Sequence, residues 1–463
     1  MNYMLIDFGS TYTKLCVIDV DQEKIIGTAK AMTTVTTNIM NGFYEAERQF
    51  IEHYGKVEIH KRIASSSAAG GLRMIAIGFV PELTLEAAKR AALGAGARIL
   101  KTYSFELNRS DLKEILELNP DIVLLAGGTD GGNRACILHN AAALAKQKVT
   151  FPIVVAGNKS TQDEIEELFI EHGISYYLAD NVMPVLNKLQ VDSAREKIRQ
   201  CFMEKIVYAK GFHDATTYVS DILYPTPQAV LKAAQMLAQG TPSEDGYGDL
   251  AIVDIGGATT DVHSICKGYP TMGGVSMKGL EEPFAKRSVE GDLGMRVSAV
   301  SLYHSCGATN ISKYYHGERN AIEQKCQYRQ LNPEFLPQDA DETEFDNAIA
   351  KCAIETSLNR HAGYLETLYM PGSVVLFQHG KDLSELKYLI GTGGILVHHD
   401  EPFELLKAAL VDQDPTILKP KHPTLLVDQE YILYAIGLLA LEYPNQAIRI
   451  LKKSLKGEIR SAK

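Results

Sequence analysis

Residues 5–11 read Leu-Ile-Asp-Phe-Gly-Ser-Thr, and residues 252–259 read Ile-Val-Asp-Ile-Gly-Gly-Ala-Thr. In each stretch an apolar run ends in an aspartate and passes into a glycine turn with hydroxyl side chains. A second apolar run follows each turn, at residues 15–20 and 262–266. Short apolar runs joined by small polar residues predict β-strands with tight turns. Because the same layout occurs in both halves of the chain, we predict two related lobes rather than one long sheet.

The chemistry of these turns suits phosphate. Glycine has no Cβ, so the backbone can bend sharply and approach a ligand closely. Successive N–H groups of such a turn bind anionic oxygen, and hydroxyl side chains add donors. Lys14 is close enough to the first turn to reach a phosphate, but it could equally point outward. The phosphate-binding candidates are Gly9, Ser10, Thr11, Lys14, Gly256, Gly257, Thr259 and Thr260.

The aspartates at the two strand ends suit a metal ion. A carboxylate repels phosphate, but it can hold Mg²⁺, usually through water, and the ion then neutralises the phosphate oxygens. Asp7 and Asp254 are therefore the predicted Mg²⁺ ligands, one from each lobe. Either turn alone is more often an ordinary tight turn. Their repetition, with hydroxyls at matching places, favours a shared site.

A third glycine cluster, Gly391-Thr392-Gly393-Gly394, follows an apolar run. A strand, a glycine cluster and a helix in that order suit close backbone approach to a nucleoside or its phosphates at a helix N-terminus. A plain glycine-rich turn is the alternative. Gly391, Gly393 and Gly394 are the candidates for such contacts. An apolar helix over residues 431–441 is predicted to close the chain.

The region after residue 63 alternates short apolar runs with helical patterns. This order predicts a parallel sheet with helices on both sides. A seam rich in Gly, Pro, Ser, Asp and Glu follows at residues 240–248. We therefore predict an α/β fold divided into residues 1–62, the start of the first lobe; 63–240, an inserted α/β region and the return to the core; and 241–463, the second lobe.

Two small-residue segments of the inserted region keep more than one interpretation. Residues 122–133 read Ile-Val-Leu-Leu-Ala-Gly-Gly-Thr-Asp-Gly-Gly-Asn, which suits an anion site at the carboxyl end of a strand. A tight connection between a strand and a helix is the favoured alternative. Residues 65–72 form either a flexible loop or a surface for close backbone packing.

Composition excludes several classes of protein. The formal charge of −10 argues against a nucleic-acid partner, which clustered Lys and Arg would bind. Seven scattered cysteines without a CxxC pair indicate reduced thiols in a cytoplasmic protein. The N-terminus lacks the pattern of a signal peptide, and no apolar stretch approaches the ~20 residues of a membrane helix. We expect the 13 histidines, including His398 and His399, to lie at the surface or in packing contacts.

The motifs resemble those of the actin, heat-shock-chaperone and sugar-kinase superfamily. Asp7–Lys14 resembles its first phosphate motif, Val253–Val262 its second, Leu389–Leu396 its adenosine motif and Ala435–Ala440 its helical connecting motif. This resemblance implies two ribonuclease-H-like lobes with ATP in the cleft between them, and a degree of lobe closure that differs between the ATP and ADP states. The Gly-Thr-Gly-Gly form of the adenosine motif and the large insertion depart from the minimal pattern.

A narrower resemblance covers the whole chain. Met4–Lys14, together with the two small-residue segments, is similar to the accessory proteins of adenosylcobalamin-dependent glutamate mutase, also called methylaspartate mutase. That family, MutL or GlmL, is distinct from the mismatch-repair protein that shares the first label. By analogy with diol dehydratase reactivases, the resemblance implies an ATP-dependent chaperone whose partners are the mutase subunits. The accessory protein would promote release of damaged cobalamin.

In that mechanism ATP hydrolysis resets the cycle, and Asp7, Asp254 or Asp261 orients the attacking water. A small-molecule kinase of the same fold and a scaffold or filament protein switched by nucleotide are the alternatives. A homo-oligomer is left open by the sequence.

Overall fold

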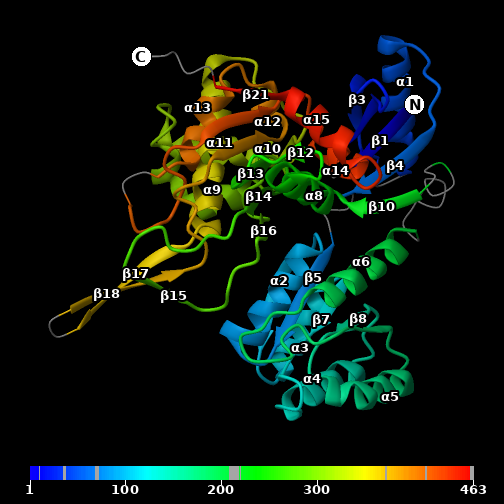
Figure 1. The fold of residues 1–463 in the computed structure, drawn as a ribbon, viewed down its shortest axis with the longest axis vertical. Coiled ribbons are helices and arrows are strands. Elements are labelled where there is room, and N and C mark those ends of the chain that lie inside the picture. Colours follow the sequence, from blue (N-terminus) through cyan, green and yellow to red (C-terminus); the bar gives the residue numbers. More distant parts are fainter. Residues whose placement is uncertain are drawn as a thin grey trace.

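The computed structural model describes residues 1–9, 11–34, 38–67, 72–207, 218, 221–370, 373–411 and 414–458. Within these ranges the chain forms two mixed sheets that lie side by side and a parallel sheet that lies apart from them, below both in Figure 1. The predicted α/β fold is therefore confirmed.

The first sheet has the strand order β10-β4-β1-β2-β3. The strands β1, β2 and β3 form an antiparallel meander, and β4 and β10 run parallel to β1. Helix α1 covers β2 and β3. The elements are β1 (Asn2–Phe8), β2 (Tyr12–Asp19), β3 (Lys24–Met32), α1 (Ile39–Tyr54), β4 (Lys61–Ser66) and β10 (Asp221–Pro225).

The second sheet repeats this topology in the order β16-β14-β13-β19-β20-β21. β13, β14 and β16 form an antiparallel meander, β19 runs parallel to β13, β20 runs parallel to β19, and β21 adds an antiparallel strand at the edge. Two copies of the order 3-2-1-4-5 confirm the pair of ribonuclease-H-like lobes. The strands are β13 (Leu250–Ile255), β14 (Thr260–Ile265), β16 (Ala285–Glu290), β19 (Tyr388–Thr392), β20 (Thr424–Asp428) and β21 (Leu455–Gly457).

Helices α8 (Thr226–Gln239), α14 (Leu433–Leu439) and α15 (Pro444–Ser454) pack between the lobes. Their apolar side chains share one core cluster with residues of β1, β2 and β4 from the first sheet and of β13, β14, β19 and β20 from the second. Figure 1 shows α8 and α14 at the junction of the lobes. The two sheets are therefore joined by one continuous hydrophobic core.

The prediction that the helix at 431–441 closes the chain is wrong. α14 ends at Leu439, and α15 and β21 follow it. Pro444 stands in the first turn of α15, where proline is well tolerated. Ile448 and Leu451 of this helix are buried.

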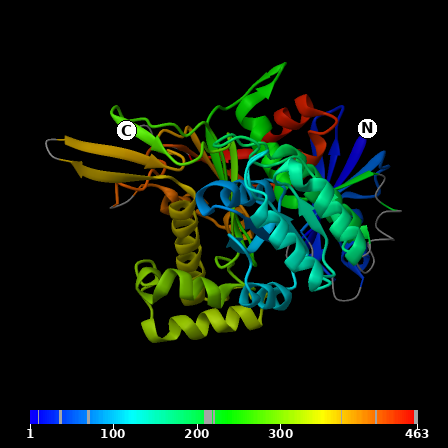
Figure 2. The same ribbon diagram turned by 90° about the horizontal axis from the view of Figure 1, so that it is seen from below.

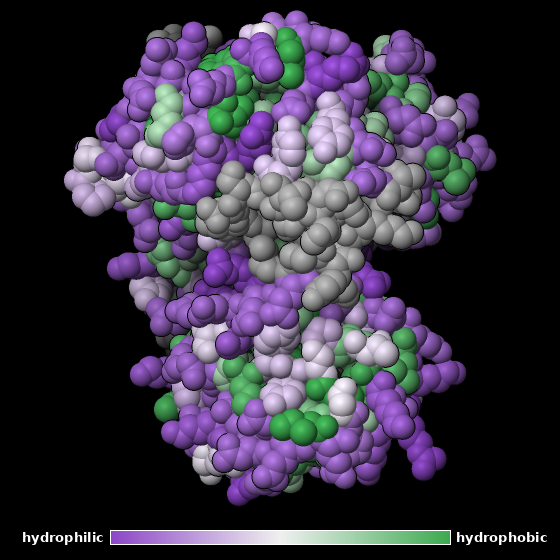
Figure 3. Space-filling model, turned by 90° about the vertical axis from the view of Figure 1, so that its right-hand side faces the viewer, coloured by the Kyte–Doolittle hydropathy of each residue, from purple (hydrophilic) through white to green (hydrophobic). Residues whose placement is uncertain are grey.

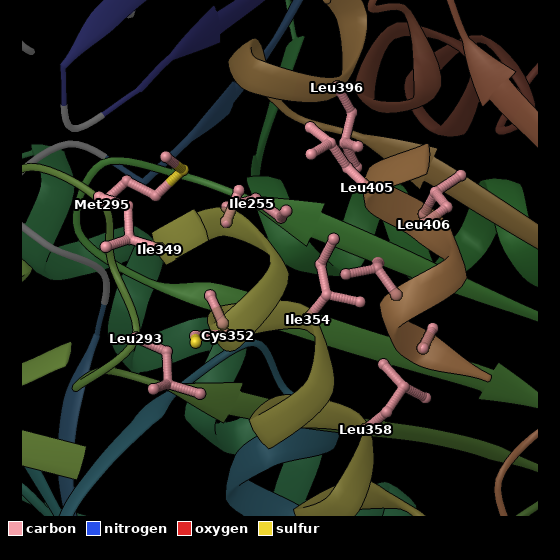
Figure 4. Packing of buried hydrophobic residues seen from close by; sticks show 14 of the residues in the cluster. Ile255, Leu293, Met295, Ile349, Cys352, Ile354, Leu358, Leu396, Leu405 and Leu406 are labelled. Carbon is pink, nitrogen blue, oxygen red and sulfur yellow. The ribbon is translucent and has the colours of Figure 1, made fainter. Parts of the chain in front are cut away.

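The outer face of the second sheet is covered by helices whose apolar residues form a separate cluster (Figure 4). A three-stranded sheet in the order β15-β18-β17 extends away from this lobe, as both ribbon views show (Figures 1 and 2). These elements are α9 (Ala299–Ile311), α10 (Ile322–Leu331), α11 (Ala340–His361), α12 (Gly394–His398), α13 (Pro402–Leu406), β15 (Val275–Lys278), β17 (Tyr364–Met370) and β18 (Ser373–His379).

The inserted unit lies in the chain between β4 and β10. Its five strands are all parallel, in the order β6-β5-β7-β8-β9, and a separate apolar cluster covers each face. The elements are β5 (Arg73–Gly78), α2 (Glu86–Gly94), β6 (Arg98–Ser104), α3 (Arg109–Leu118), β7 (Ile122–Leu125), α4 (Ala135–Lys146), β8 (Ile153–Val155), α5 (Gln162–His172), β9 (Tyr176–Leu178) and α6 (Asp192–Val207). The domain boundaries at 62/63 and 240/241 stay predictions.

The glycine segment at 127–133 is held by the side chains of two asparagines. Asn158 accepts a hydrogen bond from the N–H of Gly131 (3.1 Å) and donates to the carbonyl oxygen of Gly132 (3.2 Å). Asn181 donates to the carbonyl oxygen of Gly128 (3.0 Å) and to the carboxylate of Asp130 (2.9 Å). Because these groups satisfy one another, the structure favours a tight connection between β7 and α4. Part of the second small-residue segment, residues 68–71, lies outside the described residues.

The surface in Figure 3 is mostly hydrophilic, with scattered hydrophobic areas of the kind that ordinary protein surfaces carry. Among the described residues, no helix has both the length and the apolar character needed to cross a membrane.

Gly437 allows the close crossing of α14 and α8. A Cβ added to it would lie 1.9 Å from the carbonyl oxygen of Ala229, which belongs to the backbone of α8. Replacing Gly437 by Ala should lower the free energy of unfolding by about 1–3 kcal/mol, the usual cost of overpacking a core. Urea unfolding measures this. Gly273→Ala is the control, because a Cβ there meets nothing within 4 Å. Equal stability of the two variants would contradict the prediction.

Candidate nucleotide site

The two aspartate–glycine turns have the same backbone construction. In the hairpin of β1 and β2, Asp7 is paired with Lys14, and in the hairpin of β13 and β14, Asp254 is paired with Asp261. The N–H of Gly9 donates to the carbonyl oxygen of Tyr12 (3.1 Å), and the N–H of Gly256 donates to that of Thr259 (2.9 Å). The two turns therefore have the same length, and their sequences align residue by residue without a gap.

Both turns open into one cavity of about 690 Å³. A Cβ placed on Gly257 would lie 3.5 Å from Oγ1 of Thr11, so the turns approach each other across the cleft. The predicted residues that line the cavity are Asp7, Gly9, Thr11, Lys14, Asp254, Gly256, Gly257, Thr259, Asp261 and Gly394. Ser10 lies outside the described residues.

On the first lobe, Asp7 is almost fully buried and held by its neighbours. Its Oδ2 lies 3.1 Å from Nζ of Lys14, and its Oδ1 accepts a hydrogen bond from the hydroxyl of Thr226 (2.5 Å). Nζ of Lys14 lies 4.0 Å from the ring centre of Tyr431. Burial alone would lower the pKa of Lys14, but the oxygen of Tyr431 and the carboxylates of Asp7 and Asp254 outweigh it and raise that pKa. Lys14 thus points into the site as a charged ammonium.

On the second lobe, the aspartates have different surroundings. Burial, followed by the negative charge of Asp261, raises the pKa of Asp254 to about 7, although Lys14 opposes the shift. Among the described residues, no side chain or backbone group donates a hydrogen bond to the Asp254 carboxylate, which is partly exposed in the cavity. Asp261, in contrast, accepts hydrogen bonds from Arg287 (2.6 and 3.0 Å) and from the hydroxyl of Thr259 (2.9 Å). The carboxylate oxygens of Asp254, unlike those of Asp261, are therefore available to bind a ligand.

Three predicted residues do not reach the cavity. Thr260 is fully buried, and its hydroxyl donates to the carbonyl oxygen of Leu293 (2.7 Å). Gly391 lies within β19, between β13 and β20. Gly393 has φ +98°, and a Cβ there would lie 2.2 Å from the carbonyl oxygen of Ile255. These glycines hold the turn after β19 against β13, and only Gly394 of the cluster lines the cavity.

The sequence did not indicate several residues of this cavity. At one end, Nζ of Lys30 in the first lobe lies 2.9 Å from Nε2 of His398 in the second, and Nε2 of His399 lies 3.0 Å from Oδ1 of Asn347. Burial and the charge of Lys30 lower the pKa of His398, so its neutral ring can accept a hydrogen bond from that lysine. His398 is exposed and His399 makes a packing contact with Asn347, so both accord with the expected surface or packing roles, although both also line the cavity.

Asp428, which ends β20 and is not among the residues that line the cavity, is an aspartate that sequence reasoning did not single out. It is fully buried, and its two oxygens accept hydrogen bonds from the N–H groups of Ile432 and Leu433, both 3.0 Å long. The hydroxyl of Thr392 donates to the same carboxylate (3.1 Å). An apolar run that ends in aspartate, Leu425-Leu-Val-Asp428, was the available signal, since it repeats the pattern of the two turns.

The described part of the site lacks a preformed set of metal ligands. Among the described residues, no three His, Cys, Asp or Glu side chains converge on a point where a metal ion could sit. Mg²⁺ commonly keeps several waters and uses one or two carboxylates together with substrate phosphates. Asp254, partly exposed and without a hydrogen-bond donor among the described residues, fits that kind of ligand.

Comparison with known proteins gives both a family and distant structural likenesses. Residues 3–455 match the family model described as MutL protein. The curated Protein MutL of Clostridium tetanomorphum is 54% identical over 456 residues, which cover 98% of this chain and 99% of that protein.

The likenesses to solved structures are weaker. A glycerol dehydratase reactivase is 9% identical, with 95% of this chain and 99% of that chain covered and a TM-score of 0.35. A gluconate kinase from Lactobacillus acidophilus is 10% identical, with coverage of 99% and 92% and a TM-score of 0.34. Because these TM-scores are low, the fold assignment rests on the strand order of the two sheets. By family model and by identity over nearly its whole length, the chain belongs to the MutL protein family.

Proposed function

We propose that this protein is an ATP-dependent reactivating chaperone for adenosylcobalamin-dependent glutamate mutase. Membership of the MutL family supports the accessory role. The proposed dependence on ATP rests on one observation: two matching glycine turns, one from each lobe, line the same cavity. Seven free, buried thiols accord with a place in the cytoplasm.

Under this proposal, each part of ATP can be assigned to residues that line the cavity. The N–H groups and hydroxyls of the two turns would bind the phosphates, because a glycine turn can bring several donors to one anion. Gly394 and Ile395 of α12 line the cavity, and Phe335 lines it as well. We assign the adenosine to the side of Gly394 and Ile395, as the resemblance of Leu389–Leu396 to an adenosine motif implies.

Mg²⁺ would be held by Asp254 and Asp7, through water, and would neutralise charge on the phosphate oxygens. Asp7 already binds Lys14 and Thr226, and Asp261 binds Arg287 and Thr259. Asp254 is therefore our first choice for the acid that orients the attacking water. The turn donors stabilise the charge that develops on the phosphate.

Nucleotide-dependent closure would give the chaperone its effect on the mutase. A partner that binds an open state of the mutase about 100-fold more tightly than the closed state supplies ~2.7 kcal/mol toward opening. That is enough to populate an otherwise rare form from which damaged cobalamin can leave. Hydrolysis of ATP then returns the chaperone to its first state.

Replacing Asp254 by Asn should reduce ATP turnover by about 100-fold or more, because the amide can neither bind Mg²⁺ as a carboxylate does nor orient water. Phosphate release by the purified full-length protein measures this. Asp249→Asn is the matched control, since this exposed aspartate directly precedes β13 and lies outside the cavity. Full activity of the Asp254 variant would remove that residue from the site.

The raised pKa of Asp254 also predicts how stability depends on pH. Its pKa rises from 3.8 to about 7 in the folded protein, so its contribution to stability is complete below 3.8 and lost as the pH rises through about 7. Asp254→Asn should therefore raise the Tm of the nucleotide-free protein, with a gain that grows between about pH 4 and 7 and then levels off. A gain that is constant with pH would contradict this.

The chaperone function is tested with the mutase itself. We expect slow basal phosphate release that increases several-fold when mutase carrying inactivated cobalamin is added, together with release of that cobalamin. Intact holo-mutase is the control and should stimulate less. Stoichiometric phosphate transfer to a small acceptor would instead indicate a kinase, and concentration-dependent polymerisation with negligible turnover would indicate a scaffold.

A further inference from the structure

The inserted unit is linked to the first lobe through the chain and through a contact of α6 with β10, and it also packs on the second lobe. β4 and β10, which precede and follow it, both belong to the first sheet. Its helix α2 contacts β16 of the second sheet. Leu280, which precedes β16, is buried in the same cluster as Ala88 of α2. Arg90 of α2 donates to the carbonyl oxygen of Glu281 and lies 3.3 Å from Glu282. The unit therefore spans the two lobes.

One buried side chain joins this contact to the nucleotide cavity. Nε and Nη2 of Arg287 in β16 donate to Oδ1 of Asp261 at 3.0 and 2.6 Å. Its Nη1 donates to the carbonyl oxygens of Leu93 (3.3 Å) and Ala97 (3.5 Å), at and just beyond the end of α2. The last carbonyls of a helix lack helical partners and carry the negative end of its dipole, so a guanidinium is stabilised there.

Arg287 also fixes the position of Asp261. The guanidinium binds one carboxylate oxygen, and the hydroxyl of Thr259 binds the other (2.9 Å). Arg287 is only 5% exposed and Asp261 only 8%. Because separating a buried ion pair leaves an uncompensated charge, a displacement of Asp261 favours a matching displacement of Arg287.

We propose that Arg287 is a positioning residue for Asp261 and couples the cavity to the C-terminal end of α2. This inference rests on the proposed nucleotide function. A ligand that displaces Asp261, through attraction to its Mg²⁺ or repulsion from its phosphates, weakens the bonds from Arg287 to the two carbonyls, or moves the end of α2 with them. The inserted unit then responds to the occupant of the cavity through a single guanidinium group.

Hydrogen exchange on the full-length protein tests the coupling without relying on hydrolysis. The states compared are nucleotide-free, with Mg²⁺ and ADP, and with Mg²⁺ and a non-hydrolysable ATP analogue. We expect protection of both turns, residues 9–14 and 256–261, and a change of exchange at residues 86–98 that differs between the two nucleotides. Protection of the turns without any response at 86–98 would overturn the coupling alone. No protection of either turn would overturn the proposed nucleotide function, and the coupling with it.

Three variants test whether Arg287 acts by positioning Asp261 or only by holding α2 against the second lobe. Arg287→Gln should reduce turnover by about 100-fold, because Asp261 is paired with Asp254, our first choice for the acid that orients water, and a small misplacement there disturbs that acid. It should also abolish the response at 86–98 while nucleotide still protects the turns. Arg287→Lys keeps a cation and should restore part of both properties. Arg90→Gln is the matched control: it removes a contact of α2 with the second lobe and leaves Asp261 untouched, so turnover should be unchanged.

Equal turnover of wild type and Arg287→Gln would overturn the positioning role. The same loss in Arg90→Gln as in Arg287→Gln would overturn it as well, since docking of α2 alone would then explain the effect. If Arg287→Gln does not fold, the exchange pattern of the wild type and the partial activity of Arg287→Lys still decide the question. A wild-type exchange response together with full turnover of Arg287→Lys would show that any cation suffices, and would overturn positioning by the guanidinium.

Discussion

The shared hydrophobic core between the two sheets determines where the candidate site lies. Side chains alternate along a strand, so residues two apart share a face. In β1 the inward residues Tyr3 and Leu5 pack in the core with α8 and α14, and Asp7 is next on that face. In β13 the inward residues are Leu250 and Ile252, and Asp254 is next. In each lobe the face thus changes from apolar to charged two residues before the glycine of the turn, and the cavity lies where the core ends.

Much of the fold was accessible from the sequence, because its signals are local. The repeated turn required only that strand, aspartate and glycine be read in order, and the alternating pattern of the inserted region gave a parallel sheet. The helix after Leu439 was missed because Pro444 interrupts the apolar run and the following lysines resemble a solvated end. The residues of the candidate site were harder to predict from the sequence. Arg287 and Thr226 act on aspartates that lie far away in sequence, and no local pattern marks such pairings.

The glycine cluster at residues 391–394 shows the same limit of prediction from local sequence. A glycine cluster predicts close backbone approach but not what is approached. Gly394 lines the cavity, whereas Gly393 and Gly391 hold β19 and its turn against the chain around them. In the same way, Thr259 and Thr260 are neighbours of one chemical type, but strand alternation sends the first toward Asp261 and the second into the protein interior toward Leu293. A motif therefore locates the site, and the pleat of the strand decides which of its residues serve it.

The two hairpins differ at one position, and that difference makes the second lobe depend on the first. Opposite Asp7 stands Lys14, so the first hairpin neutralises its own acid. Opposite Asp254 stands Asp261, whose charge raises the pKa of Asp254 and is itself balanced by Arg287 from the next strand. What compensation Asp254 receives comes across the cleft from Lys14. Moving the lobes apart would weaken that attraction, whereas a bound cation would replace it. Under the proposed function, lobe closure and metal binding would be two ways of compensating the charge of the Asp254 carboxylate, and this would couple the separation of the lobes to the occupancy of the cavity.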